Sequence, residues 1–169
     1  FVQLKKDENT GKEKLIFPRY HQLDAVRYLI SQVYENGCGG NYLIQHSAGS
    51  GKSNSIAWLA HHLENLHDAN DEVVFHSIIV ITDRKVLDKQ LQRDIFNMEH
   101  KAGVVMRVDK NARQLTTALE KGERIIICTL QKFPFVDVQK VATDGKRFAI
   151  IVDEAHSSQS GKASERLKE

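Results

Sequence analysis

The 169-residue sequence has few of the features that mark special classes of protein. It contains only two cysteines, Cys38 and Cys128, and their spacing fits neither a metal site nor a disulfide framework. We interpret both as reduced residues of a cytoplasmic protein. No apolar run is long enough to span a membrane, and the first residues do not resemble a signal peptide. The sequence also has no internal repeat and no low-complexity tract.

An excess of charge of one sign is absent as well. The chain has 24 Lys and Arg against 22 Asp and Glu, which gives a formal net charge of +2. Bulk charge therefore does not require a nucleic-acid partner, and any contact with a polyanion must come from local placement of basic side chains. The apolar and charged fractions are ordinary for a globular protein, and the length fits one domain.

The most informative segment is glycine-rich and covers residues 45–53, QHSAGSGKS. It follows an apolar run at 41–44, which we expect to be a strand, and it precedes a helical pattern at 54–67. Its glycines allow several backbone N–H groups to point into one concavity, where the dipole of the following helix adds positive potential. This order of elements predicts a phosphate-binding P-loop, although His46 stands where Gly or Ala is usual.

Two side chains of this segment have expected roles of their own. Lys52 can reach the β- and γ-phosphates of a nucleotide, and the Ser53 hydroxyl is placed for Mg²⁺. The alternative is a glycine turn that only joins a strand to a helix. The residues expected to bind the phosphates are Ser47, Ala48, Gly49, Ser50, Gly51, Lys52 and Ser53.

A second polar motif follows the apolar, β-branched run 148–152, which we expect to be a buried strand. Asp153 at the end of this strand can hold Mg²⁺, directly or through a water molecule. Glu154 can orient or deprotonate the attacking water. Asp-Glu after a strand is a weak signal alone, but together with the P-loop it predicts the two halves of a nucleoside triphosphatase site.

The rest of the chain alternates apolar strands with amphipathic helices. We expect helices at 18–36, 54–67, 83–98 and 112–120, and strands at 41–44, 77–81, 104–108, 125–129 and 148–152. This pattern predicts an α/β fold with a mostly parallel sheet and helices on both faces. Residues 1–17 are expected to be an arm or linker, and 18–169 the domain. Three histidines, His61, His62 and His67, are expected on a solvated helix face rather than in a metal site.

Four segments resemble the first RecA-like domain of superfamily 2 helicases and translocases. The closer resemblance is to the motor and restriction subunit of type I restriction–modification enzymes. The segments are 19–22 (RYHQ), 45–53 (QHSAGSGKS), 79–91 (IVITDRKVLDKQL) and 151–161 (IVDEAHSSQSG), with a softer match at 128–133 (CTLQKF). The resemblance extends over residues 15–161, which is nearly the whole chain.

This resemblance implies ATP and Mg²⁺ as ligands, with Arg19 and Gln22 near the adenine and His156 coupling the nucleotide to the DNA. It implies translocation of double-stranded DNA, a separate nuclease domain, methylation and specificity subunits as partners, and a bacterial or archaeal cytoplasm. The domain is then expected to stop before its last strands. The second RecA-like domain, which supplies an arginine to the γ-phosphate, is expected outside the chain, so the chain alone should hydrolyse ATP poorly.

Candidate DNA contacts follow the predicted strand ends, where basic and polar side chains can donate to backbone phosphates. They are Arg84, Lys85, Thr129, Gln131 and Lys132. Solvated first-turn residues and a turn cap are the alternative interpretation of these positions. Two other functions remain open, namely a different superfamily 2 helicase or translocase, and a nucleotide-binding switch or scaffold without motor activity. Glu154 argues against the switch, which has no need of a residue that activates water.

Overall fold

A computed structural model describes residues 1–6, 11–82, 85–96, 98, 103–108, 112–129 and 145–153. The helices are α1 (Tyr20–Asn36), α2 (Lys52–Glu64), α3 (Lys85–Phe96) and α4 (Ala112–Lys121). The strands are β1 (Gln3–Lys6), β2 (Glu13–Ile16), β3 (Ser77–Thr82), β4 (Val105–Arg107), β5 (Ile125–Thr129) and β6 (Phe148–Val152). None of the helices in these ranges is long and apolar enough to cross a membrane.

The main sheet is parallel and has the strand order β4-β5-β3-β6. In its register, Ile79 of the central strand β3 lies between Ile126 and Ile150. β3 and β5 are buried along their whole length, as expected for β-branched runs in a sheet covered on both faces. The parallel sheet predicted from the sequence is therefore confirmed.

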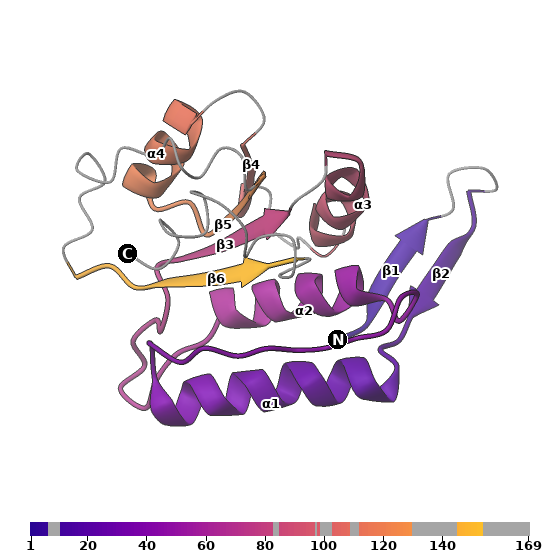
Figure 1. The fold of residues 1–169 in the computed structure, drawn as a ribbon, viewed down its shortest axis with the longest axis horizontal. Coiled ribbons are helices and arrows are strands. Elements are labelled where there is room, and N and C mark those ends of the chain that lie inside the picture. Colours follow the sequence, from indigo (N-terminus) through magenta and orange to yellow (C-terminus); the bar gives the residue numbers. More distant parts are fainter. Residues whose placement is uncertain are drawn as a thin grey trace.

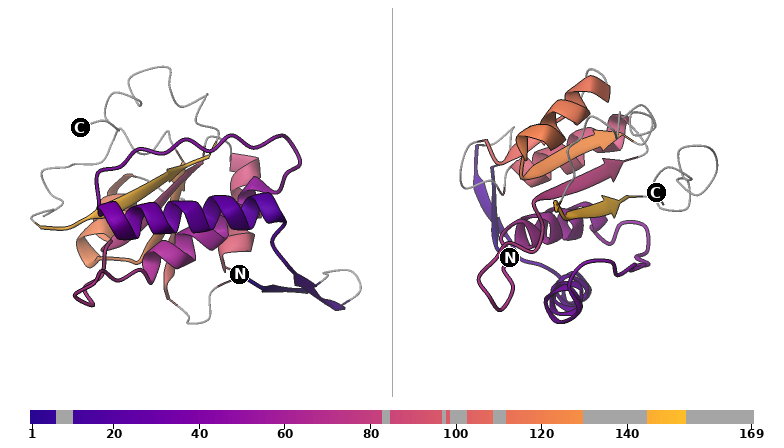
Figure 2. Two further views of the ribbon diagram at one scale, coloured as in Figure 1. Left: turned by 90° about the horizontal axis from the view of Figure 1, so that it is seen from below. Right: turned by 90° about the vertical axis from the view of Figure 1, so that its left-hand side faces the viewer.

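Helices cover both faces of this sheet (Figures 1 and 2). On one face, Ile78 and Val80 belong to a core shared with α1, α2 and α3. On the other face, Ile79 and Ile81 pack with Leu115 of α4. Successive residues of β3 therefore enter different cores, because side chains of a strand alternate between its two faces. The α/β fold with helices on both faces is confirmed.

The first helix agrees with its predicted pattern. α1 begins after Pro18, buries Val26, Leu29 and Val33, and ends at Gly37, whose φ of 71° suits glycine. α2 is buried on more than one side. Ile56 and Leu59 are half-buried, whereas the fully buried positions include Trp58. The reason is that α2 lies between α1 and the sheet, so it needs apolar contacts on more than one side (Figure 1).

Two histidines of α2 also differ from the prediction of a solvated face. His61 is half-buried, and its Nε2 lies 2.9 Å from the carbonyl oxygen of Ile95, so it joins α2 to α3. The ring of His62 lies against Phe1, with 4.2 Å between ring centroids. The residue spacing could not show this, because α3 and the N-terminal segment are the elements that cover these side chains. His67 is exposed, as predicted.

Residues 41–44 are not the strand that we expected. They are extended but lack strand pairing, and the side chain of Leu43 is 79% exposed. A strand requires a hydrogen-bonded neighbour, and the outer edge of β6 pairs with nothing in the described part of the chain. The apolar composition alone therefore predicted the wrong state. The expected arm at 1–17 is also more ordered than predicted, because β1 and β2 form an antiparallel hairpin.

Candidate phosphate-binding site

The glycine-rich loop forms a tight turn in front of α2. The Ser50 N–H donates to the carbonyl oxygen of Ser47 at 3.2 Å. Gly49 and Gly51 have φ values of 74° and 83°, in the left-handed region where a side chain is strained. Residues 47–49 are exposed, so the loop is open to a ligand from solvent.

The first turn of α2 supplies donors at the end of this loop. Gly51 is the N-cap of α2, and its carbonyl oxygen accepts from the Asn54 N–H at 3.1 Å. The N–H groups in the first turn of a helix point toward its N-terminal end, where they can donate to a ligand. Figure 1 shows this loop at the same end of the domain as the carboxyl ends of β3 and β6. Backbone donors and the helix dipole together favour an anion here.

Asp153 is carried to this edge of the sheet by β6. Its N–H donates to the carbonyl oxygen of Ile81 at 2.9 Å, which extends the pairing of β6 with β3 by one step. Asp153 is half-buried, and it follows the strand as predicted. Glu154 and His156 lie outside the described residues.

The first turn of α1 contacts the loop directly. Gln22 is 3% exposed, and its Nε2 donates to the carbonyl oxygen of Gly51 at 2.8 Å. Its Oε1 accepts from the backbone N–H of Arg19 at 2.8 Å. His21 places Nε2 3.1 Å from the carbonyl oxygen of Ser50. The predicted residues 19–22 and 45–53 are therefore brought together, although their separation in the sequence does not reveal the contact.

His46 adds a titratable group beside the loop. Its ring meets the ring of His21 edge-on, with 5.2 Å between centroids. Burial lowers the pKa of His46, and the positive charges of His21 and Lys52 lower it further. The imidazole of His46 is therefore held neutral over a wider pH range than that of a free histidine. Sequence reasoning identified His46 as unusual but missed His21 as its neighbour.

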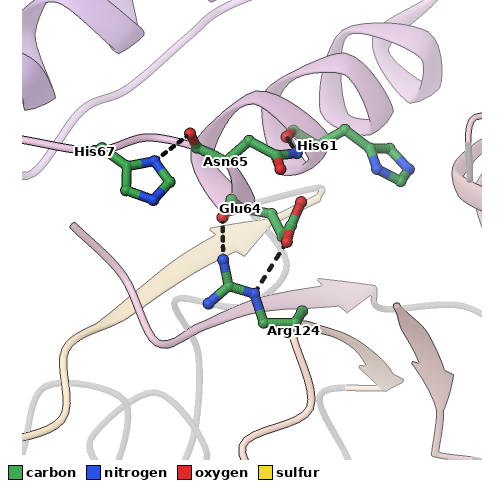
Figure 3. Close-up of polar contacts among 5 residues, drawn as sticks. All are labelled: His61, Glu64, Asn65, His67 and Arg124. Atoms are coloured by element: carbon green, nitrogen blue, oxygen red, sulfur yellow. Dashed lines mark hydrogen bonds and ion pairs between the residues drawn. The ribbon is translucent and has the colours of Figure 1, made fainter. Parts of the chain in front are cut away.

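The other end of α2 is also fixed (Figure 3). The Arg124 Nε donates to Glu64 Oε1 at 2.9 Å, and a second guanidinium nitrogen of Arg124 donates to the Glu64 carbonyl oxygen. Asn65 Nδ2 donates to the carbonyl oxygen of His61 at 2.9 Å. The helix that carries the P-loop is thus held at its first turn by α1 and at its last turn by the segment before β5.

The candidate DNA contacts are less well supported. Thr129 ends β5 as predicted, but its side chain is 3% exposed. This burial favours a structural role for Thr129 over a contact with a phosphate. Lys85 begins α3, and the candidates at 84, 131 and 132 lie outside the described residues. In the described ranges, no group of three or more His, Cys, Asp or Glu is placed to hold a metal ion.

Comparison with known proteins identifies the class of this site. The model of the SWI2/SNF2 ATPase family matches residues 21–169. The chain belongs to this family. The match includes the P-loop, α2 and the strand that carries Asp153. The chain is therefore an ATPase, helicase-like domain.

Two curated proteins are similar to this SWI2/SNF2 family domain over almost all of its length. One is a putative type I restriction enzyme MjaVIIIP endonuclease subunit of Methanocaldococcus jannaschii, 28% identical over 96% of the chain. The other is the type I restriction enzyme HindI endonuclease subunit of Haemophilus influenzae, 29% identical over 95% of the chain. The chain spans 18% and 16% of the length of these relatives. The resemblance predicted from the sequence is confirmed.

Proposed function

We propose that this chain is the ATP-binding part of a motor that moves double-stranded DNA in a type I restriction endonuclease subunit. The observation that carries the proposal is the arrangement of one edge of the sheet. There, the open P-loop at the start of α2 lies at the same end as Asp153. The similarity to two type I endonuclease subunits supports the restriction system as the setting.

ATP binding rests on the residues of the loop. The backbone N–H groups of 47–53 receive the phosphates, and Lys52 adds a positive charge beside them. The first turn of α1 touches the P-loop, which supports assigning the contact with adenine to residues 19–22. Arg19 and Gln22 are the candidates for this contact.

Mg²⁺ fits the chemistry of two side chains at this edge. Ser53 in the first turn of α2 offers a hydroxyl oxygen, and Asp153 offers a carboxylate, both hard ligands. When bound, Mg²⁺ neutralises charge on the phosphates. Ser53 from the helix and Asp153 from the end of the strand would hold this ion.

Hydrolysis and coupling fall to the residues after Asp153. Glu154 is proposed to accept a proton from the attacking water, and His156 to link the nucleotide to the DNA site. Contacts with DNA are assigned to phosphate oxygens, which carry no base sequence and so suit a motor that moves over any sequence. Arg84, Lys85, Gln131 and Lys132 are the proposed donors, with Thr129 as the weaker candidate. The DNA sequence is then read by a separate specificity subunit, which acts with a methylation subunit.

Displacement of a triplex-forming strand tests the movement of DNA. The full-length protein, assembled with methylation and specificity subunits, is given linear duplex DNA with a third strand bound away from the recognition site. We expect ATP-dependent release of the third strand, with a delay that grows with its distance. Hydrolysis of ATP without release of the third strand would favour a nucleotide switch. Release of the third strand from RNA duplexes alone would favour a different helicase.

A further inference from the structure

Two successive side chains of α1 hold two successive carbonyl groups of the P-loop. His21 Nε2 lies 3.1 Å from the Ser50 oxygen, and Gln22 Nε2 lies 2.8 Å from the Gly51 oxygen. A carbonyl oxygen only accepts, so Nε2 of His21 carries the hydrogen and donates it. Nε2 is therefore the ring nitrogen of His21 that donates to the loop.

These contacts help to fix where the N–H groups of the loop point, together with the Asn54 N–H of α2, which donates to the Gly51 carbonyl oxygen at 3.1 Å. In a trans peptide, the C=O and the N–H lie in one plane and point in opposite directions, and the described chain has no cis peptide. The Ser50 carbonyl shares its peptide with the Gly51 N–H, and the Gly51 carbonyl shares its peptide with the Lys52 N–H. Because both carbonyls are held toward α1, both N–H groups are turned away from it. These are donors that a phosphate at the P-loop requires.

The position of Gln22 is itself constrained. Its side chain is 3% exposed, and Oε1 is bonded to the Arg19 N–H at 2.8 Å. Rotating the amide to meet another ligand therefore breaks two hydrogen bonds. The contact with the loop is also tight, since a Cβ at Gly51 would lie 2.6 Å from Gln22 Nε2. Glycine is thus required at position 51 both by the close approach of Gln22 and by the φ of 83°.

We propose that His21 and Gln22 are positioning residues that orient the Gly51 and Lys52 amides of the P-loop for phosphate. This inference rests on the proposed binding of ATP at the loop, and it adds a second way for residues 19–22 to affect nucleotide binding. If Gln22 only reads adenine, its loss weakens the binding of ligands that contain the base. If Gln22 positions the loop, its loss weakens the binding of every ligand that contains the phosphates.

Inorganic tripolyphosphate separates the two roles because it has no base. Binding of ATP and of tripolyphosphate, both with Mg²⁺, is measured by calorimetry on the full-length protein and on His21→Ala, His21→Gln and Gln22→Met. Met fills the buried site of Gln22 without a donor, and Gln in place of His21 keeps an amide donor near the position of Nε2. Control variants are Gln32→Ala on α1 and His67→Ala in the segment after α2, both away from the loop.

We expect His21→Ala and Gln22→Met each to weaken the binding of ATP and of tripolyphosphate by the same factor. This factor should be about tenfold, as for one lost hydrogen bond. His21→Gln should stay within about threefold of the unaltered protein. Gln22→Met also loses two buried hydrogen bonds, so its melting temperature should fall; binding is measured well below every variant's melting temperature, so that lost binding is not lost folding. Gln22→Met that weakens ATP but not tripolyphosphate would assign Gln22 to adenine and overturn its positioning role. Unchanged binding in His21→Ala would overturn the role of His21, whereas no binding by the unaltered protein would overturn the proposed function itself.

Discussion

Arg124 binds Glu64 twice, once through the carboxylate and once through the backbone carbonyl of the last turn of α2. The carboxylate contact is 2.9 Å long, and the Glu64 side chain is 11% exposed. A cation at this position also complements the negative end of the helix dipole. The P-loop helix is therefore stabilised at the end far from the phosphates.

Removal of this contact should destabilise the domain. Arg124→Ala is expected to lower the free energy of unfolding by about 1–2 kcal/mol, because it removes two charge-assisted hydrogen bonds from a half-buried site. Urea unfolding can be followed by fluorescence of Trp58, the only tryptophan of the chain. Glu64→Gln is the matched variant. It keeps the contact of Arg124 with the backbone carbonyl, so it should lower the free energy of unfolding by less than Arg124→Ala does. Equal losses in the two variants would show that the backbone contact contributes nothing.

Thr129 offers a test of its two interpretations. Its hydroxyl is buried and has no hydrogen-bond partner in the described structure, and it pairs in register with Thr82, whose hydroxyl is in the same state. An unpaired buried hydroxyl costs free energy, so Thr129→Val should leave stability unchanged or raise it by up to about 1 kcal/mol. DNA affinity should not change. Weaker DNA binding by Thr129→Val, with an unchanged salt dependence because the hydroxyl carries no charge, would instead support the predicted contact with a phosphate.

His46 should make stability depend on pH. Its pKa in the folded protein is lowered from 6.5, chiefly by burial. The unfolded chain therefore takes up the proton first, and stability is lost as pH falls below about 6.5 toward the folded pKa. His46→Gln should show a shallower loss between pH 7 and 5 in urea unfolding. His62 has a lowered pKa too, again mainly from burial, so part of the slope should remain. A steeper slope in His46→Gln would contradict this account.

Glu154 is expected to act on turnover rather than on binding. Glu154→Gln keeps the size and hydrogen bonding of the side chain but removes the base. ATP hydrolysis by the full-length protein should fall by roughly a hundredfold or more, while ATP affinity stays within a few fold. Steady-state hydrolysis and equilibrium binding measure the two effects. Equal losses of both would place Glu154 among the metal ligands instead.

The sequence predicted most of the sheet, because its β-branched runs are long and buried on both faces. β5 and β6 lie at the predicted residues, and β3 differs from its prediction by one residue. The prediction for segment 41–44 failed because apolar composition does not specify strand pairing: the segment pairs with no described strand, although the outer edge of β6 is free in the described part of the chain. Composition cannot show which edge of a sheet is free.

The site was predicted unevenly for a similar reason. The sequence could point to the P-loop and Asp153 as candidates because glycine, lysine and carboxylate chemistry is local in the sequence. The contact of His21 with Ser50 joins residues 29 positions apart, and no local pattern encodes it. The histidines of α2 were misjudged because the elements that cover them, α3 and the N-terminal segment, are also distant in the sequence.

The most direct test of the account is ATP hydrolysis by the full-length protein, with and without linear duplex DNA, compared with Lys52→Ala. Lys14→Ala, a change at an exposed lysine of the hairpin, serves as the control. We predict that duplex DNA stimulates hydrolysis in the unaltered protein and in Lys14→Ala. Lys52→Ala should lose this stimulated hydrolysis at an unchanged melting temperature, because the charge beside the phosphates is gone. Full DNA-stimulated hydrolysis in Lys52→Ala would contradict the assignment of residues 45–53 as the ATP site.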